Sequence, residues 1–355
     1  MARTLSAALQ LKQAAIRHTP YTKFVFKSKD ESTTYDYSSR ELEYEIREAA
    51  YQGTGNLVGG GTIILRNNDL QVVNLKGYHV EPGYGYRTGN AVAEPNGDND
   101  VNEYSYAQRL WVISQENITL EGEQAIRLTL IDAWTRLAES LWRTGTEPYY
   151  TDETTYTTTV IEDILDTIIT GAGFTIDKAS PADSIIDTFT PDFDINVRPF
   201  ESAADLIYPL IQMTKCYIRP ESGLNFKTIY PQTSDSVDAT FETNTGHRYF
   251  EYTERRSVLN PNHVIVFANA EADGSWSAAN IITGEASDAT EIALYAETFA
   301  IFVAPSITSQ GDADNRASAI LTRLKAEILG GRLVAPHHVG LELYDKVEIQ
   351  DRRGL

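Results

Sequence analysis

The spacing of hydrophobic residues changes twice along this chain, and that change limits the possible folds more than any other feature. Apolar and polar residues alternate in short segments before about residue 150 and again after about residue 240. Between these blocks, apolar residues recur at the three- and four-residue spacing of an amphipathic helix. Alternation with a period of two is typical of strands that bury one face. The sequence therefore predicts an α+β fold, mostly β, in which two β-rich regions flank a helical module.

The first block contains several predicted strands separated by Gly, Asn and Asp residues. In one of them Ile126, Leu128 and Leu130 share a face, whereas Arg127 and Thr129 lie on the other. The predicted strands are residues 21–28, 61–66, 110–115 and 124–132, and the polar residues 93–105 are a predicted loop. Strands at this spacing indicate an antiparallel barrel or sandwich.

The middle block predicts a compact module of two helices and a hairpin over residues 149–234. The first helix follows a capping box of Thr159 and Glu162 and ends at the glycines of residues 171–173. The second lies within residues 201–214, where Pro209 is expected to kink it. A hairpin follows, with its turn at residues 220–223.

The second β-rich block, residues 235–355, has a strand at 263–270 and an inserted helix at 311–329. Residues 284–303 show no clear period. The alternation of residues 338–350 predicts a further strand.

Two adjacent histidines, His337 and His338, begin this last segment and suggest a metal site. Neighbouring side chains of a strand point to opposite faces, so both histidines cannot bind one ion without a bend between them. Zinc needs three or four convergent ligands. The strand interpretation therefore predicts no metal site.

Catalytic motifs are absent from the sequence. It has no glycine-rich phosphate loop and no G-x-S-x-G nucleophile turn. Its single cysteine, Cys216, excludes an intramolecular disulfide and is predicted to be a buried structural thiol. With 50 acidic residues, chance pairs of carboxylates are expected, and the acidic stretch 191–196 is interpreted as a surface loop or interface. We expect no enzymatic activity and no cofactor.

The formal net charge is −20, which argues against sequence-specific recognition of nucleic acid. No apolar run approaches the ~18 residues that span a bilayer, and we expect no signal peptide. The local basic pair Arg255 and Arg256 either contacts a carboxylate of a neighbouring subunit or is a solvated pair near a strand end. The 20 tyrosines suit subunit contacts, which are wet on one side and apolar on the other.

The order of several phrases resembles the tail-hub, or baseplate-hub, proteins of tailed bacteriophages, whose hub domains are shared with type VI secretion spike proteins. The phrases span most of the chain from about residue 20. They are NLKGYHVEPGYGY (74–86), LWVISQENITLEGEQAIRLTLIDAWTRLAESLW (110–142), VIEDILDTIITGAGF (160–174), FESAADLIYPLIQMTKCYIRPESGLNFKTIYP (200–231), RRSVLNPNHVIVF (255–267) and GLELYDKVEIQD (340–351).

This resemblance implies a structural protein of the virion, assembled in the host cytoplasm. It implies a homotrimeric ring at the tail tip that adapts a sixfold tail tube to a threefold spike or fibre. The implied partners are the distal tail or tail tube protein, the tape measure protein and the central spike protein, with DNA only in transit. The implied domains are a segment 1–19, a first β-barrel 20–148, the α+β module 149–234 and a related second β-barrel 235–355.

Candidate interface residues follow from these considerations: Tyr84, Tyr86, Arg255, Arg256 and Tyr344. Such hubs usually supply one more strand after the segment that ends this sequence, so we expect a longer natural chain or closure by another chain. The net charge also suggests an acidic channel wall that repels passing DNA. Two alternatives remain: a cell-wall polysaccharide hydrolase that uses an acidic pair, and a receptor-binding module of the tail tip.

Overall fold

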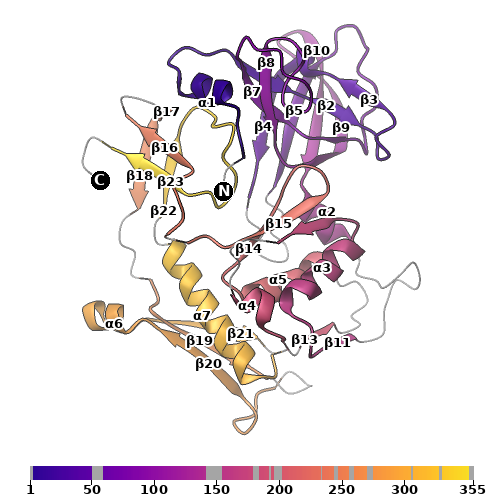
Figure 1. Ribbon diagram of the computed structural model, residues 1–355. Coiled ribbons are helices and arrows are strands. Elements are labelled where there is room, and N and C mark those ends of the chain that lie inside the picture. Colours follow the sequence, from indigo (N-terminus) through magenta and orange to yellow (C-terminus); the bar gives the residue numbers. More distant parts are fainter. Residues whose placement is uncertain are drawn as a thin grey trace.

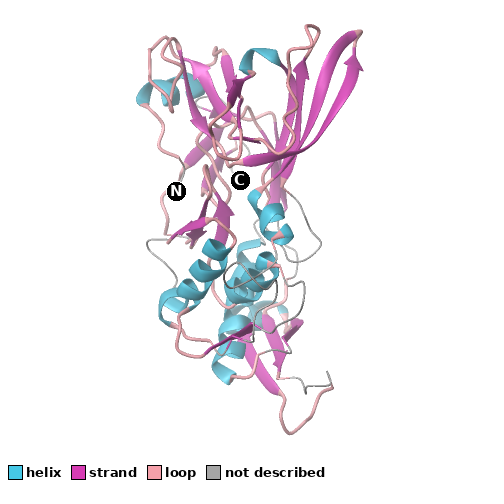
Figure 2. Cartoon of the chain, turned by 90° about the vertical axis from the view of Figure 1, so that its right-hand side faces the viewer, coloured by secondary structure: helices cyan, strands magenta, loops and turns pink. Residues whose placement is uncertain are grey.

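The computed structural model of this chain describes most of its residues (Figure 1). They form an α+β fold that is mostly β, as the sequence predicts. Figure 2 shows most of the helices in one half of the molecule and the long strands in the other. The described residues are 3–49, 59–140, 154–178, 184–191, 193–195, 202–232, 234–243, 247–255, 260–269, 275–304, 307–327 and 330–351.

Among the described residues, the N-terminal β-rich region contains helix α1 (Ala7–Ala14), the short 3₁₀ helix η1 (Ser38–Arg40) and two sheets. The larger sheet has seven strands in the order β3-β2-β6-β9-β10-β5-β4, and the smaller has the order β1-β7-β8. The strands are β1 (Pro20–Lys23), β2 (Val25–Lys27), β3 (Thr34–Asp36), β4 (Glu41–Arg47), β5 (Gly60–Arg66), β6 (His79–Val80), β7 (Gly83–Arg87), β8 (Asn102–Tyr106), β9 (Leu110–Leu120) and β10 (Glu123–Ile131).

Strand β10 confirms the predicted alternation. Ile126, Leu128 and Leu130 are buried in the core of the larger sheet, whereas Arg127 is exposed. Strands β9 and β10 form a hairpin whose turn contains Glu121 (φ 51°) and Gly122 (φ 88°). Two consecutive positive φ angles are the geometry that matches the twist of a tight hairpin. Local pattern and local turn chemistry thus agree here.

The predicted strand 21–28 is two strands in different sheets, β1 and β2, with a break at Phe24. The Phe24 side chain is fully buried, and its backbone N–H donates to the Ser38 hydroxyl at 2.9 Å instead of to a strand. The alternating pattern did not predict this corner. Phe24 fits the apolar–polar alternation, yet the backbone passes from one sheet to the other at this residue. The predicted loop 93–105 is also shorter, because its end forms β8.

The middle of the chain forms the predicted module of helices and a hairpin. Its main helices, α3 and α5, pack on each other, and β12-β15-β14 form a small sheet. The elements are β11 (Thr154–Tyr156), α3 (Ile161–Gly171), β12 (Thr175–Asp177), α4 (Ser184–Thr188), β13 (Phe193–Ile195), α5 (Ala203–Gln212), β14 (Tyr217–Pro220) and β15 (Asn225–Ile229). Helix α2 (Ala133–Glu139) lies before the predicted start of the module at residue 149, but it packs into the same core. Both predicted helices and the predicted hairpin are therefore confirmed.

The start of α3 differs from the prediction. The residue at the N-cap is Val160, which makes no side-chain cap, so Thr159 lies one position too early to form the capping box. Helix α5 does have a side-chain cap, since the Ser202 hydroxyl accepts from the Asp205 N–H at 3.2 Å. Pro209 lies inside α5, and its kink stays a prediction.

In the described part of the C-terminal β-rich region there are three small sheets, with strand orders β17-β16-β23, β18-β22 and β20-β19-β21. Helix α7 crosses one face of the sheet β20-β19-β21 (Figure 1). The elements are β16 (Ala239–Glu242), β17 (His247–Arg248), β18 (Glu251–Arg255), β19 (His263–Ala268), β20 (Ile282–Ser287), α6 (Ala289–Tyr295), β21 (Phe299–Ala304), α7 (Gln310–Glu327), β22 (Gly330–Val334) and β23 (Val347–Gln350).

The two β-rich regions differ from the pair of closed barrels that the resemblance implies. Among the described residues, no sheet closes into a barrel in either region. The described part of the first region has two sheets, and Tyr84 and Tyr86 of the smaller sheet belong to a different cluster from the core of the larger one. The strands of the second region are divided among three sheets. The predicted helix 311–329 is α7, and part of its apolar face is buried in the core that also contains the helices of the module. The boundaries at residues 148 and 234 stay a prediction.

Candidate functional site at the junction of the chain ends

The double-histidine segment is not the predicted strand 338–350. Strand β22 ends at Val334, turns follow, and only Val347–Gln350 pair as β23. Tyr344 in these turns has φ 70°, a left-handed conformation that interrupts a strand. The alternation was a coincidence of composition in an irregular segment.

This segment lies beside the N-terminal residues and helix α1. The Arg3 N–H donates to the Gly340 carbonyl at 2.9 Å, and the Val339 N–H donates to the Gln13 side-chain oxygen at 2.8 Å. Val339 and Leu9 are buried in the same small core. Residues more than 300 positions apart in the sequence are therefore packed together.

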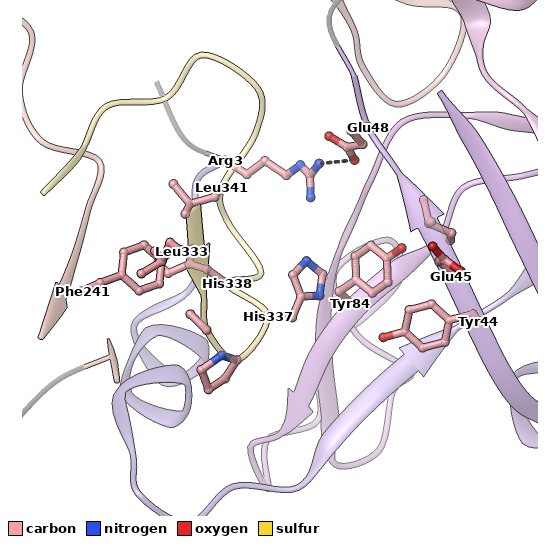
Figure 3. A pocket seen from close by; sticks show the side chains of 13 residues that line it. Arg3, Tyr44, Glu45, Glu48, Tyr84, Phe241, Leu333, His337, His338 and Leu341 are labelled. Atoms are coloured by element: carbon pink, nitrogen blue, oxygen red, sulfur yellow. Dashed lines mark ion pairs between the residues drawn. The ribbon is translucent and has the colours of Figure 1, made fainter. Parts of the chain in front are cut away.

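A pocket of about 590 Å³ lies between this segment and strands β4 and β7 (Figure 3). At one end, Arg3 and Glu48 approach to 4.0 Å. Burial raises the pKa of Glu48, although the Arg3 charge opposes that shift. The pocket is lined by Arg3, Tyr44, Glu45, Ile46, Glu48, Tyr84, Phe241, Leu333, Ala335, Pro336, His337, His338 and Leu341.

The two histidine rings have different neighbours. The His337 ring packs edge-on against Tyr84, with 4.3 Å between ring centroids. The His338 ring packs against His247 at 5.2 Å. Burial, together with the neighbouring His247 and His337, lowers the pKa of His338 to about 4. The ring is therefore neutral near pH 7.

The pocket does not assemble a recognisable catalytic set. Within the described ranges, no three His, Cys, Asp or Glu side chains are arranged to hold a metal ion. Cys216 is buried, as predicted, and lies in the core of the module. We call this region, where the N-terminal residues and the segment after β22 meet, the junction. Neutral aromatic contacts and buried ion pairs hold it together.

The most buried of these ion pairs involve Arg219 of the hairpin strand β14. The Arg219 residue is only 2% exposed. Its guanidinium donates to the Glu342 carboxylate at 2.5 Å, the Asp345 carboxylate at 3.2 Å and the Leu343 carbonyl at 2.7 Å. Glu342 also accepts from Arg3 at 2.9 Å. One buried guanidinium thus links the module, the C-terminal segment and the N-terminus. The sequence analysis missed this role, although an arginine within a short apolar strand is an unusual feature.

The candidate interface residues occupy different environments. Tyr84 and Tyr86 are buried within the chain, where the Tyr86 hydroxyl donates to the His337 carbonyl at 3.0 Å. Tyr344 stacks on Tyr217 with 4.4 Å between centroids. Arg255 is the last residue of β18, and Arg256 lies outside the described residues. The structure therefore does not bring the five together, and their role between subunits stays a prediction.

Comparison with known proteins finds likeness in structure only. No family model matches the sequence, and no curated protein does. The chain is similar to a tail protein from Neisseria meningitidis, with a TM-score of 0.59 and 11% identity over 94% of this chain and 87% of that one. It is similar to the 43 kDa tail protein of prophage MuSo2 from Shewanella oneidensis, with a TM-score of 0.57 and 12% identity over 94% and 90%.

A prophage tail protein from Listeria monocytogenes matches with a TM-score of 0.45 and 9% identity over 83% of this chain and 76% of that one. The described part of the chain contains no helix long and apolar enough to cross a membrane. At these identities the likeness concerns the fold. The chain is similar in fold to the Neisseria tail protein and the Shewanella prophage tail protein over 94% of its length.

Proposed function

We propose that this protein is a structural component of a phage-type tail, and that it forms a threefold ring, the tail hub, at the tail tip. The observation that carries the proposal is the similarity of fold to two tail proteins over 94% of the chain. The order of the sequence phrases, found independently of that similarity, points to the same class. Fold alone does not determine function, so the chemistry of the junction must also be consistent with a structural role.

The junction supports a structural role. Its buried charges are engaged with one another: Arg219 is bonded to Glu342 and Asp345, and Glu342 is bonded to Arg3. Catalytic acids and bases are usually accessible to a substrate, whereas these groups join distant parts of the chain. We therefore propose that the protein acts mechanically and is not an enzyme.

In the proposed ring, each of three copies contributes its two β-rich regions, and six such regions face the tail tube. Both regions have unclosed sheets among the described residues, so we propose that neighbouring chains complete them. Arg255, Arg256 and Tyr344 are the proposed contacts between copies. The net charge of −20 favours an acidic channel wall that DNA passes without binding.

Cryo-electron microscopy of tail particles that contain this chain tests the proposal. We expect three copies around the tail axis at the tip, in contact with the tube on one side and with a spike or fibre on the other. Six copies per ring repeated along the tube would contradict the hub assignment. Absence of the chain from the particle would contradict the tail assignment.

A further inference from the structure

A basic pocket of about 610 Å³ lies where the segment after helix α1 meets the end of strand β7. Helix α1 lies beside β7 in the first β-rich region (Figure 1). The charged and polar side chains that line the basic pocket are those of Lys12, Arg17, His18, Thr19, Arg87 and Thr88. None of the described residues in its lining is acidic. A chain with a net charge of −20 thus has a concave surface of the opposite charge.

The backbone that carries these cations is held in place. The Arg87 N–H donates to the Thr19 carbonyl at 3.0 Å, which joins the end of β7 to the segment after α1. The His18 Nδ1 donates to the Ala15 carbonyl at 2.9 Å, since a carbonyl oxygen only accepts. The His18 ring packs on the buried Tyr86, with 4.7 Å between ring centroids. The two walls of the basic pocket therefore keep their spacing.

The cations have no counter-charge in the part of the chain that the structure describes. None of Lys12, Arg17 and Arg87 forms an ion pair with a described carboxylate. By contrast, Arg40 of the same region lies 2.7 Å from Asp69. Lys12 is in the last turn of α1, where its charge also favours the helix dipole. Arg17 and Arg87 are exposed, so they are the cations most available to a ligand.

One acid contacts the lining but does not belong to it. Glu103 is buried and accepts from the Thr88 hydroxyl at 2.8 Å and from the Asn90 side-chain amide at 3.0 Å. It also accepts from the Ser6 hydroxyl. These donors satisfy the Glu103 carboxylate. An anion that pairs with the exposed arginines must therefore come from outside the described chain.

An apolar side chain is part of the same lining. Ile16 precedes Arg17 and is 79% exposed. The guanidinium group of arginine matches the geometry of a carboxylate, whereas an exposed isoleucine is stabilised by contact with another apolar group. A ligand that fits both has carboxylates and an apolar side chain. An acidic polypeptide segment meets this requirement, and an inorganic anion does not.

We propose that the basic pocket binds an acidic segment of a partner protein, in which Asp or Glu residues flank an apolar side chain. The carboxylates pair with Arg17 and Arg87, and the apolar side chain contacts Ile16. A second copy of this chain is the poorer occupant, because it opposes one net charge of −20 with another. A short segment brings few charges, and salt screens it from those beyond about 8 Å.

A DNA duplex fits the basic pocket less well than an acidic segment does. Duplex DNA carries its phosphates in a line along the helix, so a protein that binds it needs cations spread along a surface. Here the cations surround one pocket. Binding of the acidic segment does not depend on formation of the ring.

Fluorescence anisotropy of labelled peptides with the full chain tests the proposal. The probe is a short peptide in which glutamates flank a leucine. In one comparison peptide glutamine replaces each glutamate, and in another serine replaces the leucine. We expect the probe to bind, the glutamine peptide not to bind, and the serine peptide to bind several-fold more weakly. Added salt should weaken the probe, because its ion pairs are partly exposed.

Charge reversal locates the binding. The double variant R17E/R87E should weaken the probe at least about tenfold, because two attractive charges become repulsive. The matched control K29E/K76E reverses two other exposed cations and changes the net charge equally. It should bind like the parent protein. Ile16→Ser should weaken the probe several-fold and leave the glutamine peptide unbound.

Failure of the probe to bind, or binding that R17E/R87E leaves unchanged, would overturn the proposal. Three other results would overturn it by assigning the basic pocket to another ligand. They are displacement of the probe by inorganic phosphate as effectively as by unlabelled peptide, tighter binding of a DNA duplex that R17E/R87E abolishes, and loss of self-association in R17E/R87E. A chain that binds the probe but stays monomeric would support this proposal and contradict the ring.

Discussion

Strands β10 and β21 have similar alternating patterns but different surroundings. In β10 the apolar residues Ile126 and Leu128 point into a core, and the alternate face carries Arg127 and Thr129. In β21 the inner face is apolar, and so is the outer face, where Ile301 is 62% exposed. A strand that only needs to fold can be polar on its outer face. The second apolar face of β21 therefore points to a contact outside the chain.

Arg219 links the module to the segment after β22 and, through Glu342, to Arg3 near the N-terminus. The variant Arg219→Met removes the guanidinium that Glu342 and Asp345 share, while Glu342 keeps its pair with Arg3. Removal of one partner of a buried ion pair costs about 3–5 kcal/mol, so we expect a loss of that size in the free energy of unfolding by urea. Arg127→Met, which breaks the exposed pair with Glu116, should cost less than about 1 kcal/mol. Equal losses of unfolding free energy in the two variants would show that the buried Arg219 pairs stabilise the fold no more than an exposed pair does.

Truncation of one residue on each strand tests the comparison directly. Leu128→Ala removes a fully buried side chain and should lower the free energy of unfolding by about 2–5 kcal/mol. Ile301→Ala removes an exposed side chain and should change it by no more than about 0.5 kcal/mol in the isolated protein. Thermal and urea unfolding measure both. A large loss for Ile301→Ala would mean that the outer face of β21 belongs to the core.

The sheet β20-β19-β21 has no room for a larger side chain where helix α7 packs on its inner face. A Cβ atom at Gly284 would lie 2.2 Å from the backbone of Ala313, so helix α7 packs directly on β20 there. We expect Gly284→Ala to cost about 1–3 kcal/mol through displacement of α7. Gly311→Ala is the control, because its Cβ would make only ordinary contact with Phe189. It should be neutral or stabilise α7 by up to about 1 kcal/mol.

The smallest predicted effect depends on pH and concerns the junction. The folded-state pKa of His338, about 4, is below the ordinary value of 6.5. Between these values the unfolded chain binds a proton that the folded chain does not. The contribution to stability is complete above about pH 6.5 and declines as the pH falls toward 4. His338→Gln should remove roughly 1–2 kcal/mol of that decline. Urea unfolding at several pH values measures it, and an unchanged slope would contradict it.

Elements that depend on neighbouring residues were predictable. Strand β10, helix α3 and the hairpin of β14 and β15 follow from local period and turn residues, and each is confirmed. The corner at Phe24 and the turns after Val334 were not predictable, because each depends on contacts with distant segments. In both places the apolar–polar alternation of the sequence continues although the strand itself has ended.

The candidate site was predictable only in part. Tyr84 and His337 were both singled out from the sequence, but their mutual contact arises because the C-terminal segment packs against strand β7. The ion pairs of Arg219 with Glu342 and Asp345 join residues more than 120 positions apart, and no local pattern indicates such partners. The exposure of Ile301 was not predictable either, since a sequence does not show which apolar face of a strand is covered.

The oligomeric mass of the purified protein tests the central claim most directly. Multi-angle light scattering across a range of concentrations should give a species three times the mass of the 39.5 kDa chain. A single monomeric species at every concentration would contradict the hub, as would a stable dimer.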